Sequence, residues 1–188
     1  SLTGDLNMDR LISTRIIVIL ILSILSASTF AASLSQRNID QYIHSMELLK
    51  TSTNKEIIAI RNGFKNNAEI NFDVDEQGNI AIMSQAIKQL DDSKIGALNK
   101  VIKAADYNSI GTWTKVGDKI AAAMMAFQMK KEPTDLSQMT PDMLAAMPES
   151  MRAQIEGAMR MMKAAQKVPE GDIALIKANY SKLQNLMQ

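Results

Sequence analysis

The chain of 188 residues contains no cysteine and a single histidine, His44. Without cysteine it can form no disulfide, no thiolate metal site and no thiol nucleophile, and it cannot carry the lipid of a lipoprotein. His44 lies in a predicted helix next to Ile43, and we expect it to be a structural residue. No pattern singles out a serine, threonine or lysine as a nucleophile. We therefore expect no enzymatic activity and no cofactor.

Aromatic residues are few, at 4% of the chain, and the eight glycines are scattered without forming a phosphate-binding loop. The formal net charge is only +1, and the longest basic run is Lys130-Lys131. Nucleic acids and strongly anionic surfaces are therefore not expected as partners. Because aromatic residues are few and the chain has 14 methionines, the predicted core is aliphatic and rich in methionine.

Long apolar runs are absent except near the N-terminus. Residues 16–25 are almost all aliphatic, Arg10 and Arg15 precede them, and small residues follow. This order is typical of a secretory signal peptide, and the small residues predict cleavage after Ala31 or Ala32. The alternative is a membrane anchor that stays uncleaved, although a spanning helix needs roughly 20 apolar residues.

The signal peptide sets the expected organisation of the chain. Residues 1–32 are predicted to be upstream sequence and signal peptide, with translation starting at Met8. Residues 33–188 are predicted to form one all-helical domain in the periplasm of a bacterium or outside the cell, without membrane association after cleavage. No pattern indicates an oligomeric state.

Apolar residues recur at helical spacing through almost all of residues 33–188, which predicts an all-α bundle of about seven helices. Capping patterns predict helix starts at Ser35, Thr53, Ser93 and Thr140. Residues 132–140 are rich in polar and turn-forming residues, and they predict a linker and a possible sub-boundary of the domain.

Residues 70–82 depart from the helical pattern. Apolar and polar residues alternate on both sides of residues 75–79, where Gly78 is expected to adopt a positive φ. This alternation predicts a structural turn or one small β-hairpin within the helical bundle.

The same segment also matches part of a calcium-binding loop, at residues 73–84. Such a loop needs oxygen ligands at alternating positions and a glycine at its sharp bend. Gly78 occupies the bend, but Ser84 stands where the loop needs a bidentate glutamate. Calcium binding is thus an alternative to the structural turn, and its candidate ligands are Asp73, Asp75, Gln77 and Asn79.

Methionines recur every four residues in the C-terminal third, and they are the second candidate site. Thioethers are soft ligands suited to Cu(I), and methionine surfaces also adapt to varied apolar partners. The third interpretation is core packing, since Met151, Ile155, Met159 and Met162 share one face of a predicted helix. The candidate copper ligands are Met139, Met143, Met147 and Met151.

An export signal, amphipathic helices and the lack of a catalytic pattern together favour a non-enzymatic binding function. We expect the protein to bind another protein or a peptide in a groove between amphipathic helices. The alternative is a metal-binding protein, with calcium at residues 73–84 or Cu(I) at the clustered methionines.

Overall fold

The computed structural model describes residues 33–66, 73–132 and 139–186. The predicted signal peptide lies outside these residues. By its contacts the chain divides after Ser33, and Leu34–Gln188 forms one compact unit. None of the helices in the described part has both the length and the apolar character that crossing a membrane requires.

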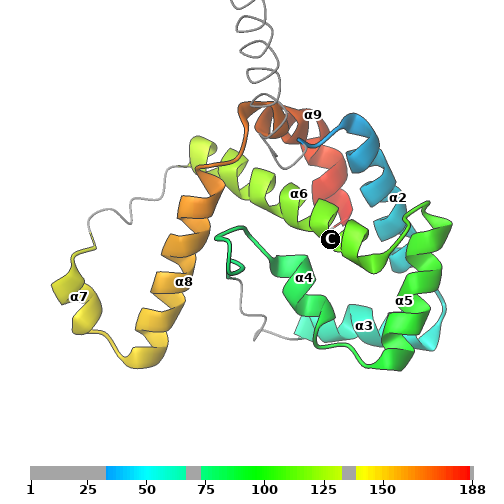
Figure 1. The fold of residues 1–188 in the computed structure, drawn as a ribbon, viewed down its shortest axis with the longest axis horizontal. Coiled ribbons are helices and arrows are strands. Elements are labelled where there is room, and N and C mark those ends of the chain that lie inside the picture. Colours follow the sequence, from blue (N-terminus) through cyan, green and yellow to red (C-terminus); the bar gives the residue numbers. More distant parts are fainter. Residues whose placement is uncertain (1–32, 67–72, 133–138, 187–188) are drawn as a thin grey trace, which may run out of the picture. The chain divides into compact units, whose positions relative to one another are not determined.

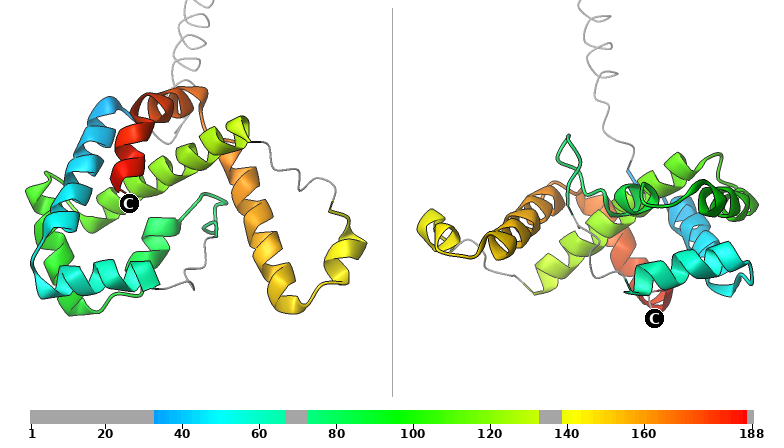
Figure 2. Two further views of the ribbon diagram at one scale, coloured as in Figure 1. Left: turned by 180° about the vertical axis from the view of Figure 1, so that it is seen from behind. Right: turned by 90° about the horizontal axis from the view of Figure 1, so that it is seen from below.

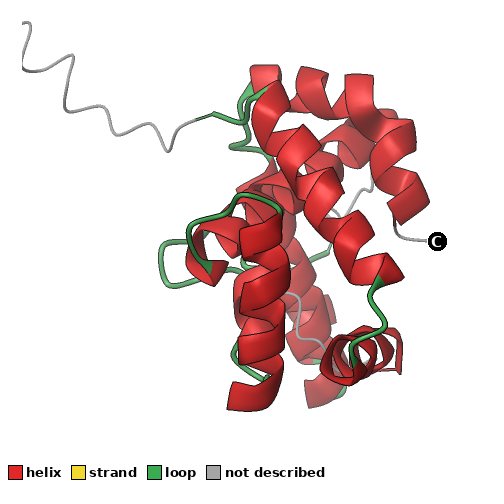
Figure 3. Cartoon of the chain, turned by 90° about the vertical axis from the view of Figure 1, so that its right-hand side faces the viewer, coloured by secondary structure: helices red, strands yellow, loops and turns green. Residues whose placement is uncertain are grey.

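The described residues form eight helices and no strand, which confirms the prediction of an all-α fold (Figure 1, Figure 3). The sequence predicts about seven helices, and the described residues form eight. The helices are α2 (Gln36–Thr51), α3 (Lys55–Asn66), α4 (Ile82–Ile87), α5 (Asp92–Ala104), α6 (Ile110–Lys131), α7 (Pro141–Ala145), α8 (Glu149–Ala165) and α9 (Glu170–Leu186).

The longest helix, α6, lies at the centre of the fold and packs against α2, α4, α5, α8 and α9. Trp113 near its start is almost fully buried, and its Nε1 donates a hydrogen bond to Ser45 Oγ on α2 over 2.8 Å. Its ring stacks on Tyr42, with the ring centroids 6.2 Å apart. Because this bond satisfies the buried indole nitrogen, the largest core side chain fixes α6 against α2. The other large, fully buried side chains of the core are aliphatic: Ile39, Ile57, Leu98, Ile102 and Ile176.

The short helix α4 is held on α6 by a carboxylate and a glycine. Ala81 at its N-terminus offers no capping side chain, and Asp118 of α6 replaces it by accepting hydrogen bonds from Met83 N, over 2.6 Å, and Ser84 Oγ. A Cβ added at Gly117 would lie 2.9 Å from Met83 Cγ, so the glycine leaves room for the Met83 side chain of α4.

The small β-hairpin predicted at residues 70–82 is not formed in the part of that segment that the structure describes. Among residues 73–82 only Val74 and Ile80 pair, as an isolated antiparallel bridge, and residues 70–72 lie outside the described part. A second strand has no room to extend, because α4 begins at Ile82.

Both the backbone and the side chain of Asp75 close the turn: its N–H donates to Asn79 O over 2.7 Å, and its carbonyl accepts from Gly78 N–H over 2.9 Å. Asp75 Oδ1 accepts hydrogen bonds from the backbone N–H groups of Gln77 and Asn79, both over 2.9 Å. Gly78 has a φ of +77°, as the sequence predicts. Local bonds from an aspartate to the following backbone compete with strand pairing, and they favour a turn here.

The helices α7 and α8 form a hairpin, seen in yellow and orange beside the other helices in Figure 1 and Figure 2. Most of the predicted linker, residues 133–138, lies outside the described part. Within that part α8 packs on α6, whereas α7 packs extensively on no other helix and contains no buried residue. We refer to α7 and α8 as the hairpin, and to α2–α6 and α9 as the body.

Candidate interaction surface on the helical hairpin

The four candidate copper ligands lie in four different local segments. Met139 precedes α7, Met143 lies within it, Met147 lies in the turn before Pro148, and Met151 lies in the first turn of α8. Proline at 141 starts α7 and Pro148 caps α8, so the spacing of four residues does not continue along one helix. Binding of Cu(I) at these residues stays a prediction.

The hairpin exposes large apolar side chains. Met143 and Met151 are each 50% exposed, and they are two of the three large hydrophobic side chains that are exposed in the described part. Met147 is half-buried although it lies in the turn between the two helices. Met143 and Met151 therefore lie at the surface and not inside a core.

The predicted core stripe on α8 is not the face that the protein buries. Met151 is exposed, and Ile155, Met159 and Met162 are only half-buried. The buried residues of α8 are instead Gly157, Met161 and Ala165. At 100° per residue these three lie on a neighbouring side of the helix, which contacts α6, so the methionine stripe stays outside that contact.

Small side chains form the contact between α8 and the body. Ala165 of α8 clusters with Ala126 of α6, Ile173 of α9 and Ile80 before α4. These residues hold the C-terminal half of α8 against α6 and α9. The N-terminal half, which carries Met151 and Ile155, has no buried residue.

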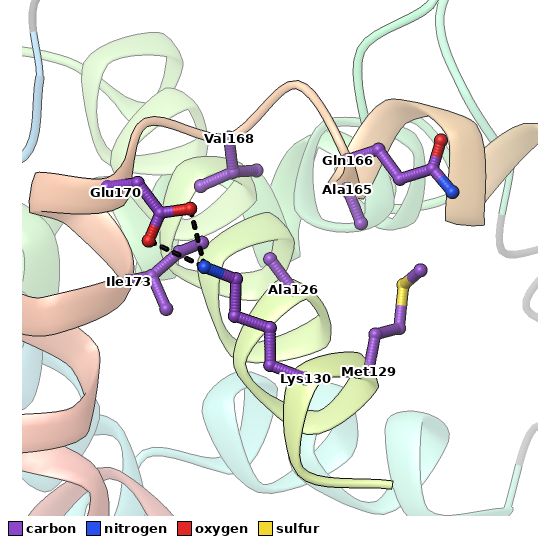
Figure 4. Close-up of a pocket in the computed structure, with 8 residues that line it drawn as sticks. All are labelled: Ala126, Met129, Lys130, Ala165, Gln166, Val168, Glu170 and Ile173. Atoms are coloured by element: carbon purple, nitrogen blue, oxygen red, sulfur yellow. Dashed lines mark hydrogen bonds and ion pairs between the residues drawn. The ribbon is translucent and has the colours of Figure 1, made fainter. Parts of the chain in front are cut away.

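A pocket of about 240 Å³ lies where the end of α8 meets α6 and α9 (Figure 4). Its wall is mainly apolar and includes Met129, Val168 and Ile173, while Lys130 and Glu170 form an ion pair at its edge. Pockets that hold drug-sized ligands measure about 300–1,000 Å³. This pocket is smaller than that range.

The pocket and the methionine stripe are adjacent. Gln166, which lines the pocket, follows Met162 by four residues, and residues with this spacing are neighbours on a helix surface. We define the methionine surface as six apolar side chains of the hairpin that are exposed or half-buried: Met143, Met147, Met151, Ile155, Met159 and Met162.

The opposite side of α8 is tied to the body by an ion pair. Arg160 Nε and Nη2 donate hydrogen bonds to the two carboxylate oxygens of Asp73, over 3.0 and 2.7 Å. The hydrogen bond from Arg160 holds the pKa of the Asp73 carboxyl below its usual range. Both side chains are partly exposed, so this bidentate pair orients the hairpin more than it stabilises the fold.

Two of the predicted calcium ligands, Asp73 and Asp75, accept hydrogen bonds in this ion pair and in the turn. Asp73 is bound by Arg160, and one carboxylate oxygen of Asp75 accepts two backbone N–H groups. Gln77 and Asn79 are exposed. No group of three or more acidic or histidine side chains that could hold a metal ion occurs among the described residues. Calcium binding at this loop stays a prediction.

Three other polar side chains of the body, His44, Asp118 and Tyr107, lie away from the pocket. His44 is exposed. Burial raises the pKa of the Asp118 carboxyl, which caps α4, and it raises the pKa of the Tyr107 hydroxyl to about 12. Neither group lines the pocket described above.

Sequence reasoning missed the partners of three carboxylates because their contacts join distant parts of the chain. Arg160 is 87 residues from Asp73, and Asp118 is 35 residues from Met83. Asp172 of α9 accepts a hydrogen bond from the N–H of Leu34, 138 residues away. A local sequence pattern does not predict hydrogen bonds between residues so far apart in the chain.

Comparison of the chain with models of protein families, with curated proteins and with solved structures finds no match. The functional argument therefore depends on the geometry of this chain.

Proposed function

We propose that this is an exported, non-enzymatic protein that binds another protein or a peptide on the methionine surface of its hairpin. One observation carries the proposal. The amphipathic helix α8 leaves its apolar stripe outside the contact with the body. An apolar helix face of this kind is uncommon on a soluble domain unless it meets a partner.

The shape of the surface suits an extended or helical segment of a partner. From Met151 to Met162 the stripe covers twelve residues of helix, or about 18 Å at 1.5 Å per residue. The pocket at the end of α8 can take one apolar side chain of the partner. Amphipathic helices bind such surfaces through anchors spaced three or four residues apart. Methionine side chains adapt to different partners because they are unbranched and flexible.

The start of the folded unit supports the export part of the proposal. Leu34 is buried and Ser35 caps α2, so the fold begins one or two residues after the two predicted cleavage positions. A signal peptide removed there leaves almost no additional chain before the first helix.

Binding can be tested with reduced, carboxymethylated α-lactalbumin, a protein that stays unfolded in solution. We expect the protein to bind it, and the double variant Met143→Gln/Met151→Gln to bind at least about tenfold more weakly, because both apolar anchors are replaced by amides. The double variant Met143→Leu/Met151→Leu is the matched control and should bind like the native protein, since leucine keeps the apolar volume.

The same variants separate this function from copper binding. Leucine keeps the apolar surface but removes the thioether ligands. A protein whose function depends on Cu(I) would lose it in the leucine variant. Equal binding of the unfolded protein by the native and glutamine forms contradicts the proposal.

A further inference from the structure

The two borders of the methionine stripe on α8 differ in character. One border adjoins the buried face of the helix, which contains Gly157, Met161 and Ala165. The other border is charged. At 100° per residue, Arg152 and Lys163 lie about 20° and 40° beyond Met159, the last apolar side chain on that side. We call these two residues the cationic edge.

The cations of the cationic edge have no anionic partner within the described part of the chain. Arg152 is half-buried and Lys163 is exposed, and neither side chain forms a hydrogen bond or an ion pair there. Arg160, farther around the same helix, differs because it is held by the Asp73 carboxylate. The unpaired cations of α8 are therefore the two that adjoin the uncovered stripe.

The acidic residue of this side of α8 does not neutralise the cationic edge. Glu156 lies beyond the edge, farther from the methionine stripe. It precedes Arg160 by four residues, the order in which opposite charges attract each other along a helix. A partner that covers the stripe thus meets two positive charges at its open border.

We propose that the partner of the methionine surface is an amphipathic helix that carries acidic side chains beside its own apolar face. This inference rests on the proposed function and adds the charge of the partner to it. Arg152 and Lys163 are eleven residues apart, or about 16 Å along α8. Two carboxylates with the same spacing on an antiparallel helix reach both cations while the apolar faces pack together. Arginine beside an apolar surface is also typical of strong protein contacts.

A second copy of the hairpin suits this surface less well. In an antiparallel pair of identical helices the same borders face each other, so the two cationic edges would repel. An anionic membrane is also disfavoured, because two cations at the edge of a helix attract such a surface only weakly. An acidic helix is the occupant that satisfies both the apolar stripe and the unpaired charges.

The test uses two designed helical peptides of about 18 residues that differ only in charge. Both have a stripe of leucines. The acidic peptide has two glutamates eleven residues apart beside the stripe, and the basic peptide has lysines at the same positions. Fluorescence anisotropy measures binding of each to the protein. At low salt we expect the acidic peptide to bind about tenfold more tightly, and 0.5 M NaCl should reduce this preference by screening.

Charge reversal separates the cationic edge from the general charge of the protein. Arg152→Glu/Lys163→Glu should reverse the preference, so that the basic peptide binds more tightly. The variant should fold, because neither side chain is buried or paired in the described part. Lys100→Glu/Lys115→Glu is the matched control, since it makes the same change in net charge at exposed positions of α5 and α6. It should keep the native preference.

The outcomes distinguish this inference from the proposed function. Equal binding of the two peptides, weakened for both by Met143→Gln/Met151→Gln, overturns the acidic partner and leaves the proposed function intact. The same holds if neither peptide binds but unfolded α-lactalbumin does. If the native protein binds neither the peptides nor α-lactalbumin, both fail. Vesicles of phosphatidylcholine and phosphatidylglycerol complete the test. Vesicle binding that needs the cationic edge, without discrimination between the peptides, assigns the edge to a membrane and overturns the inference.

Discussion

The body of the domain buries mainly large side chains, whereas the hairpin buries two small residues and one methionine and exposes two other methionines. In the body, Trp113 and several branched aliphatic side chains are almost fully enclosed. In the hairpin, Gly157 and Ala165 are two of the three buried residues, and Met143 and Met151 are half exposed. Both regions are helical and amphipathic, so the pattern of apolar residues alone does not distinguish a core from a binding surface.

The body and the hairpin differ in burial because their helices have different numbers of neighbouring helices. The central helix α6 is covered by five neighbours, and its apolar side chains are enclosed from several directions. The helix α8 packs mainly on α6 through a face that includes Gly157 and Ala165, and the methionine stripe beside that face is not buried. An apolar stripe becomes core only where a second element covers it.

The largest effect is expected at the centre of the body. Trp113→Ala removes a buried ring and leaves Ser45 without its indole donor, so it should destabilise the domain by about 3–5 kcal/mol. The matched change in the hairpin, Ile155→Ala, should cost less than about 1.5 kcal/mol because the side chain is only half-buried. Urea unfolding of both variants gives the comparison. Equal losses would show that the stripe of α8 is enclosed like the core.

The next effect concerns the close contact of α4 with α6. Gly117→Ala places a methyl group 2.9 Å from Met83 Cγ and 3.0 Å from Tyr42 Cε2, and should cost about 1–3 kcal/mol. Gly96→Ala in α5 is the control, because no atom lies within 4 Å of its added Cβ. It should stabilise the domain by about 0.5–1 kcal/mol through helix propensity. Thermal unfolding that moves both variants in the same direction would contradict this packing.

A smaller effect is expected where the hairpin is tied to the body. Arg160→Met breaks the bond to Asp73 and should cost less than about 1 kcal/mol, since both partners are partly exposed. Hydrogen exchange should nevertheless become faster in α8 and stay unchanged in α6. Faster exchange in both helices would mean that the hairpin and the body open as one unit.

The same ion pair predicts a dependence of stability on pH. Because the folded-state pKa of Asp73 lies below its unfolded value of about 3.8, its stabilising contribution is present above that value. The contribution is lost as the pH falls through the lowered folded-state pKa. The difference in stability between the native protein and Arg160→Met should therefore shrink below about pH 4 and be constant from pH 5 to 7. Urea unfolding over this pH range measures it.

The smallest effect on stability is expected on the methionine surface. Met143→Gln/Met151→Gln should change the free energy of unfolding by less than about 0.5 kcal/mol, because both side chains are half exposed. A similar double change at Met46 and Met83, which pack against the core of the body, should cost several times more. Thermal unfolding that destabilises the surface variant as strongly as the body variant would assign these residues to a core.

Much of the fold could be predicted from the sequence because helix periodicity and caps are local. The predicted cap at Ser35 is confirmed, and so is the start of α7 at Thr140 with its proline. The caps of α3 and α5 lie near the predicted ones, at Asn54 in place of Thr53 and at Asp91 in place of Ser93. At the starts of both α3 and α5, several neighbouring polar residues could act as the N-cap, and the sequence pattern does not predict which one does.

The sequence does not predict which face of α8 is covered. The stripe of Met151, Ile155, Met159 and Met162 is the more apolar face, yet the protein buries Gly157, Met161 and Ala165. That choice depends on the close approach of α8 to α6, which small residues permit. It is decided by the tertiary structure and not by local periodicity.

The most direct test of the account observes each methionine methyl group by NMR while reduced, carboxymethylated α-lactalbumin is added. The account predicts shifts or broadening for the methyl groups of Met143, Met151 and Met159, and unchanged signals for Met46 and Met83 in the body. Unchanged signals throughout, or changes that affect the body as strongly as the hairpin, would contradict the proposal that the methionine surface binds proteins.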